Sequence, residues 1–199
     1  MGPVAIVPAS PQWPAEFARV AARLREILGT SALRIDHIGS TSVPGLDAKD
    51  VIDVQVAVAD LDEMTAACRL LGSAGYRVLM PAFDHPVPHV VDDDGHSVRK
   101  GFAAEPAGSR RVHVHVRVLS APNYRYALLF RDFLRLHPAS AGAYVRYKQR
   151  AAQLFADDSE AYAALKDSVC DLIYLPALDW AERSGWVATG TDEGVRPTA

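Results

Sequence analysis

The chain has 199 residues and a formal net charge of −3, with 49% hydrophobic and 23% charged residues. This composition is typical of one globular unit, and it lacks the excess of Lys and Arg that broad, nonspecific nucleic-acid binding requires. No run of about 18 apolar residues predicts a membrane span, and no signal-peptide pattern opens the chain. We therefore expect a cytoplasmic protein in which Cys68 and Cys170, which lack metal-like spacing, are free thiols.

The first part of the chain predicts helices alternating with short strands. Apolar residues at helical spacing predict a helix over 10–28 with Ser10 as its cap, and a second helix over 61–75 follows Asp60. The segment 81–110 is rich in Pro, Asp, Gly and His and fits either a hairpin or a mobile loop. Alternating patterns predict four strands, at 33–39, 51–58, 76–80 and 110–120.

The pattern becomes helical after Pro122 and stays so. Three helices are expected, over 123–138, 139–155 and 159–186, with Pro176 kinking or breaking the last. The predicted organisation is an α/β unit at 1–120, a helical region at 121–187 packed on it, and a disordered tail at 188–199. A dimer through the apolar C-terminal helices is compatible with this pattern but is not required by it.

The segment HIGSTSVPGLDAKDVIDVQVAV, residues 37–58, carries the first functional signal. The predicted strand places Asp53 and Gln55 on one face and its aliphatic residues on the other. In the loop before it, Gly39 would let the backbone approach a phosphate closely, and Ser40, Thr41 and Ser42 offer hydroxyl and N–H groups. A carboxylate at Asp53, with Gln55 as a weaker partner, would then hold Mg²⁺ against the phosphates.

This arrangement follows the logic of polymerase-β-type nucleotidyltransferases, which pair a Gly-Ser loop with an Asp-x-Asp strand and a third acid on a later strand. Here position 55 is Gln, and the later strand VHVHVRV carries His113, His115 and Arg117 on its polar face. A simpler interpretation stays open, in which Asp53 is satisfied by neighbouring N–H groups or an arginine.

The VHVHVRV strand has three interpretations of its own. A central histidine could attack a phosphate, as in histidine-triad hydrolases, which would make His115 catalytic. Two histidines and Asp53 could hold a transition metal. The favoured interpretation is a lining of His113, His115 and Arg117 for an anion.

The residues assembled so far resemble the GrpB family. The resemblance extends from PQWPAEF through the 37–58 segment and VHVHVRV to NYRYALLFRDFLRLHP and the YVRYK and AYAALK helices, and looks most like the branch fused behind dephospho-CoA kinase. It implies a nucleotidyltransferase-like mixed α/β (α+β) sheet with a helical C-terminal region. No P-loop pattern occurs, so kinase activity is not carried over.

The family likeness also favours a nucleotide role for Lys148 and Lys166, which could reach a γ-phosphate. The alternative is a solvated helix face, and Lys49 is interpreted as a turn residue. We expect Mg²⁺-dependent transfer of a nucleoside monophosphate from an NTP to a small acceptor, with Asp53 and His115 catalytic. Two alternatives stay open: a non-catalytic nucleotide- or CoA-binding regulator, and histidine-dependent phosphate chemistry.

Overall fold

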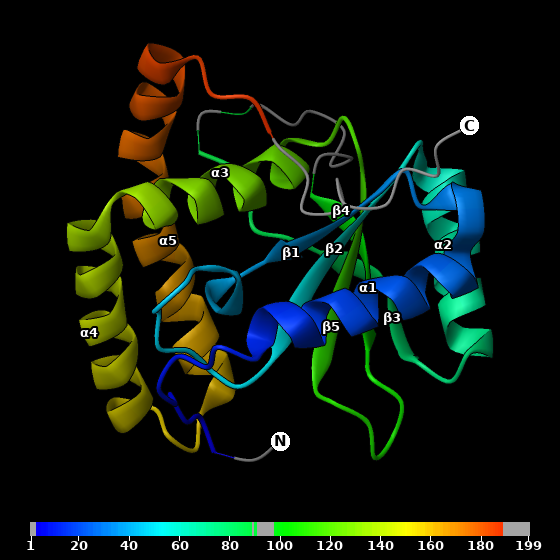
Figure 1. Ribbon diagram of the computed structural model, residues 1–199, viewed down its shortest axis with the longest axis horizontal. Helices are drawn as coiled ribbons and strands as arrows, with labels where there is room; N and C mark the ends of the chain where they lie inside the picture. The colour runs from blue at the N-terminus through cyan, green and yellow to red at the C-terminus, as the bar shows by residue number, and fades with distance from the viewer. Residues whose placement is uncertain (1–2, 89, 91–97, 189–199) are drawn as a thin grey trace.

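The protein is described here by a computed structural model covering residues 3–88, 90 and 98–188 (Figure 1). In this part of the chain the strands form one five-stranded sheet in the order β1-β2-β5-β4-β3. Strands β2 and β5 are parallel and the other neighbours are antiparallel, so the sheet is mixed as predicted. The strands are β1 (Arg34–Ile38), β2 (Ile52–Val58), β3 (Arg77–Phe83), β4 (Arg99–Ala104) and β5 (Val112–Val118).

Helices α1 (Trp13–Leu28) and α2 (Leu61–Ser73) cover one face of the sheet (Figure 1). The aliphatic residues that alternate along β2 and β5 pack against these helices in the main hydrophobic core. Burial of apolar area contributes roughly 25 cal/mol per Å², so the packing of this face stabilises the fold. Because the aliphatic side chains of each strand point into this core, the alternate polar side chains point to the opposite face of the sheet.

Three helices form the C-terminal region: α3 (Pro122–Leu136), α4 (Pro138–Leu154) and α5 (Ser159–Ser184). They share a second core with residues of the segment after β1, and α3 also packs on the opposite face of the sheet through Tyr124 and Leu128, against Ile38 and Ala57. The helical region therefore packs on the α/β unit. The division at 120/121 remains a prediction.

Several local predictions meet different outcomes. Asp60 caps α2 by accepting a hydrogen bond from the Glu63 N–H at 2.9 Å, as expected. Ser10 does not cap α1, because the helix begins at Trp13 and Gln12 holds the cap position. The Ser10 hydroxyl instead accepts a hydrogen bond from the Gln12 N–H, in the turn before the helix. Residues 99–104 form β4, which pairs antiparallel with β3, so the hairpin alternative for 81–110 is correct where the chain is described.

Pro176 does not break α5, which continues for 26 residues through that position. A proline removes one backbone hydrogen bond, but packing of the flanking turns against α3 and α4 can retain the helix. Of the predicted tail, residues 189–199 lie outside the described part of the chain.

The parallel register of β2 and β5 decides which polar residues meet. Asp53 pairs with His113, and Gln55 pairs with His115. Since side chains alternate along a strand, these four residues lie on the same face of the sheet, opposite the main core. This face, together with the C-terminal helices, encloses the candidate site.

Candidate functional site

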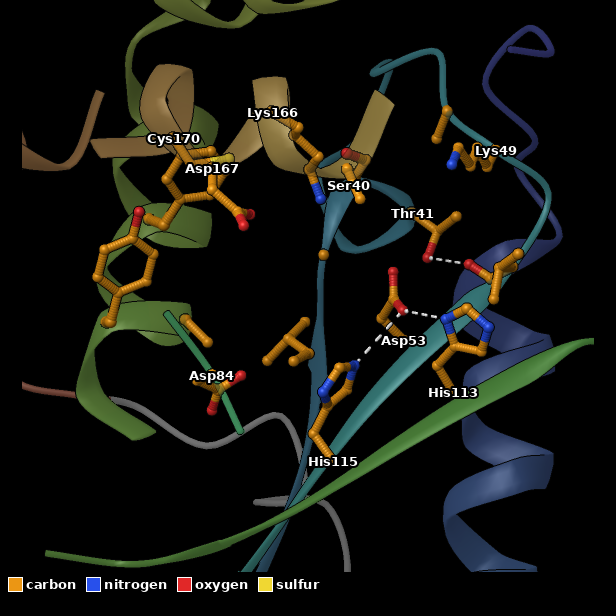
Figure 2. Close-up of a pocket in the computed structure, with 18 of the residues that line it drawn as sticks. Ser40, Thr41, Lys49, Asp53, Asp84, His113, His115, Lys166, Asp167 and Cys170 are labelled. Atoms are coloured by element: carbon orange, nitrogen blue, oxygen red, sulfur yellow. Dashed lines mark hydrogen bonds and ion pairs between the residues drawn. The ribbon is translucent and has the colours of Figure 1, made fainter. Parts of the chain in front are cut away.

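A cavity of about 360 Å³ lies between the polar face of the sheet and the C-terminal helices (Figure 2). Its sheet wall consists of the loop after β1, the start of β2, and β5. Its helical wall consists of residues from α3, α4 and α5. Concave sites with a few convergent polar groups are the usual binding sites of small molecules, and this one gathers most of the residues that the sequence predicted.

Gly39 brings the loop after β1 directly onto Asp53. Its φ is 68°, in the left-handed region that favours glycine, and a Cβ at this position would overlap the Asp53 carboxylate. The short helical turn Ser40–Ser42 then follows. A glycine is required here both by conformation and by space, because the backbone packs directly on the Asp53 side chain; the predicted approach of this backbone to a phosphate stays a prediction.

Of the three hydroxyl residues in this turn, Ser40 and Thr41 line the cavity. The Thr41 hydroxyl donates to the carbonyl of Val51 at 3.2 Å and contacts His37 Nε2 at 3.0 Å, so it braces the loop against β1 and β2. Ser42 lies apart from the cavity lining. Its hydroxyl donates to the Gly39 carbonyl at 2.5 Å.

Asp53 is flanked by the two histidines of β5 (Figure 2). Its Oδ1 lies 3.4 Å from His113 Nδ1 and 3.8 Å from His115 Nε2. Burial raises the pKa of Asp53, but the contacts with His113 and His115 outweigh it and hold that pKa well below its usual range. Burial, together with the charges of Arg117 and Lys100, lowers the pKa of His115 to about 4. At neutral pH, Asp53 is therefore ionised and His115 is uncharged.

Arg117 and Gln55 belong to a buried hydrogen-bond network at the edge of the cavity, and of the two only Arg117 lines it. Arg117 donates two hydrogen bonds to Asp84, at 2.7 and 2.8 Å, and a third to Gln55 Oε1 at 2.5 Å. Lys100 binds the same Asp84 at 2.6 Å, and the Gln55 amide donates to the Tyr124 carbonyl at 3.2 Å.

The placement of this network matters for two predicted roles. Gln55 is fully buried, does not line the cavity, and has both ends of its amide engaged, so the structure does not bring it to Asp53 as a second metal ligand. Arg117 does line the cavity, but its guanidinium is already paired. Arg117 therefore neutralises Asp84 rather than offering a free charge to a ligand.

The helical wall contributes Lys148 from α4 and Lys166 from α5, and Lys49 approaches from the loop before β2. Among the described residues, no carboxylate lies within 4 Å of any of these three ammonium groups. Lys49 lies over the Tyr162 ring at 3.9 Å, and Lys148 donates to the Asp47 carbonyl. We call Lys49, Lys148 and Lys166 the lysine wall.

The lysine wall shows the electrostatic cost of placing like charges together. Burial and the neighbouring Lys166 lower the pKa of Lys148 to about 7 and that of Lys49 to about 8. Burial also disfavours the charged form of Lys166, but Cys170, Asp53 and other acidic groups outweigh it, so its pKa rises. An anion in the cavity would favour the charged form of all three lysines.

Lys49 is one of the site residues that sequence reasoning missed. It was interpreted as a turn residue, yet it lines the cavity. The AKD sequence offered a signal, because a residue in the short segment between the Gly39 loop and β2 lies near that loop in space. In the folded chain the Lys49 ammonium lies over the ring of Tyr162 from α5, 113 positions later in the sequence, and no local pattern reveals that contact.

The donor set suits a magnesium ion only in part. Asp53 is an ionised carboxylate, and none of the described residues gives it a permanently charged partner within 4 Å. No group of three His, Cys, Asp or Glu residues that could hold a metal is present among the described residues. Mg²⁺ commonly takes one or two carboxylates and completes its shell with water and phosphate oxygens. The residues therefore fit one magnesium ion brought in with a phosphorylated ligand, and they do not fit a two-metal centre.

No helix in the described part of the chain has the length and hydropathy needed to cross a membrane.

The mixed five-stranded sheet with a helical C-terminal region packed on it is the α+β architecture that the sequence predicted. The model of the GrpB family matches residues 3–175, and the chain belongs to that family. Its structure matches a solved structure described as the conserved protein GrpB from Enterococcus faecalis, with a TM-score of 0.74 and 28% identity, covering 89% of this chain and 99% of that one. A weaker likeness, with a TM-score of 0.46 and 12% identity, is to the Cid1 poly(U) polymerase, covering 70% of this chain and 40% of that one.

Among curated relatives, the chain is 36% identical over 200 residues to a dephospho-CoA kinase of Mycolicibacterium paratuberculosis. That alignment covers 92% of this chain and 48% of the kinase, so the chain spans about half the length of such relatives. It is also 33% identical to a UPF0157 protein of Pseudomonas aeruginosa, covering 97% of this chain and 75% of the relative. The predicted resemblance to GrpB proteins and to the branch joined to dephospho-CoA kinase is confirmed.

Proposed function

We propose that the cavity binds a nucleoside triphosphate with one magnesium ion and transfers its nucleoside monophosphate to a small acceptor. The observation that carries this proposal is the lysine wall, in which three ammonium groups from three separate elements converge on one cavity without a carboxylate partner among the described residues. Such an arrangement is costly when empty and favourable around a polyanion.

The arrangement suggests where the parts of the nucleotide lie. The β- and γ-phosphates would contact the lysine wall, and the α-phosphate would lie near Ser40 and Asp53, which line the same cavity. Tyr126 and Phe130 on the α3 side of the cavity offer apolar surface for the base.

In this proposal, Asp53 would hold the magnesium ion, which when bound neutralises negative charge on the phosphates. Lys166 would stabilise the charge that develops on the departing pyrophosphate, since its ammonium is the one whose pKa is raised in the cavity. The loop from Gly39 to Thr41 would orient the α-phosphate for in-line attack by the acceptor. The buried network of Arg117, Asp84 and Gln55 would keep this wall rigid.

A second candidate is a nucleotide-binding module without catalysis. It is favoured by one observation, namely that Gln55 is locked between Arg117 and Tyr124 and leaves Asp53 as a single acid on β2. The relatives named dephospho-CoA kinase make a CoA-type nucleotide a reasonable ligand for such a module.

Thermal unfolding in the presence of ligands tests the proposal. Wild type and Asp53→Asn are compared with ATP, CTP, GTP, UTP and dephospho-CoA, each with and without Mg²⁺, with Asp62→Asn on the far helix α2 as the matched control. A ligand that binds only the folded state raises the melting temperature as its concentration exceeds its dissociation constant. We expect a Mg²⁺-dependent rise with a nucleoside triphosphate that is retained in Asp62→Asn and lost in Asp53→Asn.

Two other results would change the conclusion. A rise that needs no Mg²⁺ and survives in Asp53→Asn would favour the non-catalytic module. No rise with any nucleotide would contradict both candidates.

A further inference from the structure

The lysines of this chain are few, and most of them lie in one place. Only four of its 21 Lys and Arg residues are lysines, and three of these four, Lys49, Lys148 and Lys166, line the cavity. An arginine attracts an anion as well as a lysine does, but its guanidinium stays protonated, whereas a buried lysine can release its proton. The use of lysine at these positions therefore allows the cavity a neutral amine, which arginine does not.

Lys148 has the surroundings that favour a neutral amine. The residue is 2% exposed, and in the part of the chain that the structure describes no carboxylate lies within 4 Å of its nitrogen. Its Nζ lies 4.8 Å from the centroid of the Tyr144 ring. Burial and the neighbouring Lys166 lower the pKa of Lys148 to about 7, so above that pH most molecules carry it as an uncharged amine.

This amine can keep its hydrogen bond and still present a lone pair to a ligand. One N–H of Lys148 is used by the Asp47 carbonyl. Rotation about the Cε–Nζ bond lets the lone pair take either of the two remaining positions on the nitrogen. Ala163 and Asp167 of α5 are exposed and line the same cavity, so a small molecule can reach Lys148 from solvent.

The other two lysines of the wall supply the positive charge that Lys148 lacks. Burial disfavours the charged form of Lys166, but Cys170 and other neighbouring groups outweigh it and raise its pKa. Burial and Lys166 lower the pKa of Lys49 to about 8, so near neutral pH it is still mainly charged. Figure 2 shows the Lys166 side chain directed into the cavity. A neutral amine beside two ammonium groups suits a ligand that joins an anion to an electrophilic carbon.

We propose that Lys148 is a site of acylation by acyl phosphates, with Lys49 and Lys166 holding the phosphate of the donor. The lone pair of Lys148 Nζ forms a bond to the acyl carbon, and the bond from that carbon to the bridging oxygen breaks. The electron pair leaves with the phosphate, which takes up the proton that the amine releases. The step does not require the proposed nucleotidyl transfer.

Acylation would change what the cavity binds. The product is an uncharged amide, so the lysine wall loses a group that an incoming polyanion would otherwise protonate and hold. The acyl group also occupies part of the cavity of about 360 Å³. We therefore expect acylation of Lys148 to inhibit the binding of polyphosphates.

Mass spectrometry of the whole protein treated with acetyl phosphate near pH 7.5 tests the proposal. Acetylation of each of the four lysines is followed with time. Lys100 is the internal reference, because its ammonium is paired with Asp84 at 2.6 Å. One unit of pKa changes the uncharged fraction of an amine about tenfold, so we expect Lys148 to react at least about tenfold faster than Lys100. With acetylimidazole, which carries no phosphate, this preference should be smaller.

Two further comparisons test whether the phosphate is held by the lysine wall. Saturating inorganic triphosphate should protect Lys148 from acetyl phosphate, and Lys166→Met should slow its acetylation about tenfold. Arg150→Met, on the exposed side of α4, is the matched control and should leave the rate unchanged. In isothermal titration calorimetry, acetylated wild type should bind triphosphate about tenfold more weakly than untreated protein, at an unchanged melting temperature.

The contrary results each overturn the proposal. Faster acetylation of Lys49, Lys100 or Lys166 than of Lys148, or no acetylation of Lys148, would remove the site. An equal preference with acetylimidazole, or a rate at Lys148 that triphosphate leaves unchanged, would show that no phosphate is held beside it. Acetylation of Lys148 in a protein that transfers no nucleotide would contradict the proposed function and leave this proposal intact.

Discussion

On the sheet wall of the cavity the charged groups contact side-chain partners, whereas on the helical wall the ammonium groups of Lys148 and Lys166 have no carboxylate partner among the described residues. On the sheet wall, Arg117 and Lys100 bind Asp84, and Asp53 faces two histidines. On the other wall, no carboxylate of the described residues lies within 4 Å of Lys148 or Lys166.

The difference separates residues that hold the fold together from residues available to a ligand. A buried charge is destabilising unless it is paired, so the pairing of Arg117 with Asp84 is a condition for folding around that side of the cavity. The unpaired lysines tolerate their mutual repulsion because they stay partly solvated or lie on aromatic rings, and they gain most from a bound anion. Changes to the two walls should therefore affect different measurements.

The largest effect is expected from Arg117→Met. It removes the Arg117 hydrogen bonds to Asp84 and Gln55 while Lys100 still pairs with Asp84, and we expect a loss of about 2 kcal/mol in the free energy of unfolding. Urea denaturation measures this loss. Arg111→Met, on the exposed residue just before β5, serves as the control and should change stability by less than about 0.5 kcal/mol. Equal effects of the two changes would show that the paired network does not hold the sheet wall.

Lys166→Met should affect binding rather than stability. Removing one of three converging ammonium groups should weaken the binding of inorganic triphosphate about tenfold, or roughly 1.4 kcal/mol. The free energy of unfolding should change by less than about 0.5 kcal/mol, because the relief of repulsion toward Lys49 and Lys148 is offset by the lost attraction to Asp53. Isothermal titration calorimetry gives the affinity, with Arg150→Met on the exposed side of α4 as the control. A clear loss of stability without a loss of affinity would make Lys166 a structural residue.

The smallest effect is a dependence of stability on pH. The pKa of Lys148 is lowered to about 7 by burial and by Lys166, whereas in the unfolded chain it returns to its ordinary value near 10.5. Between pH 7 and about 8.5 the unfolded state therefore binds more protons than the folded state, so stability rises with pH, by about 1 kcal/mol for this group. Urea denaturation at both pH values, in wild type and Lys148→Met, measures the difference.

Taking the difference between the two proteins cancels other groups that titrate in the same range. Burial raises the pKa of the Cys68 and Cys170 thiols, which opposes the lysine effect at the upper end of the window in both proteins alike. An identical rise in wild type and Lys148→Met would mean that Lys148 is charged in the folded state at neutral pH.

The sequence was sufficient for most features that depend on neighbours along the chain, although the predicted Ser10 cap and the predicted break at Pro176 were wrong. The alternation of β2 and β5 predicted which of their residues face the core, and Asp60 predicted the start of α2. The Gly39 turn and the Asp53 strand were also readable, because the loop and strand are separated by only a dozen residues. These signals depend on backbone geometry with periods of two or about 3.6 residues, which a local pattern records directly.

What only the tertiary structure decided is the partner of each polar group. Asp84 lies in a segment with no clear pattern, yet it binds Arg117 from β5, 33 positions away, and thereby occupies a guanidinium that the sequence assigned to a ligand. Gln55 loses its metal role to Arg117 and Tyr124, and Lys49 gains a place in the cavity beside Tyr162. Such pairings depend on strand register and helix packing, where the energy of a contact is independent of the distance along the chain. A sequence pattern can thus place a charge on a face, but only the folded chain determines whether that charge is already neutralised or remains available to a ligand.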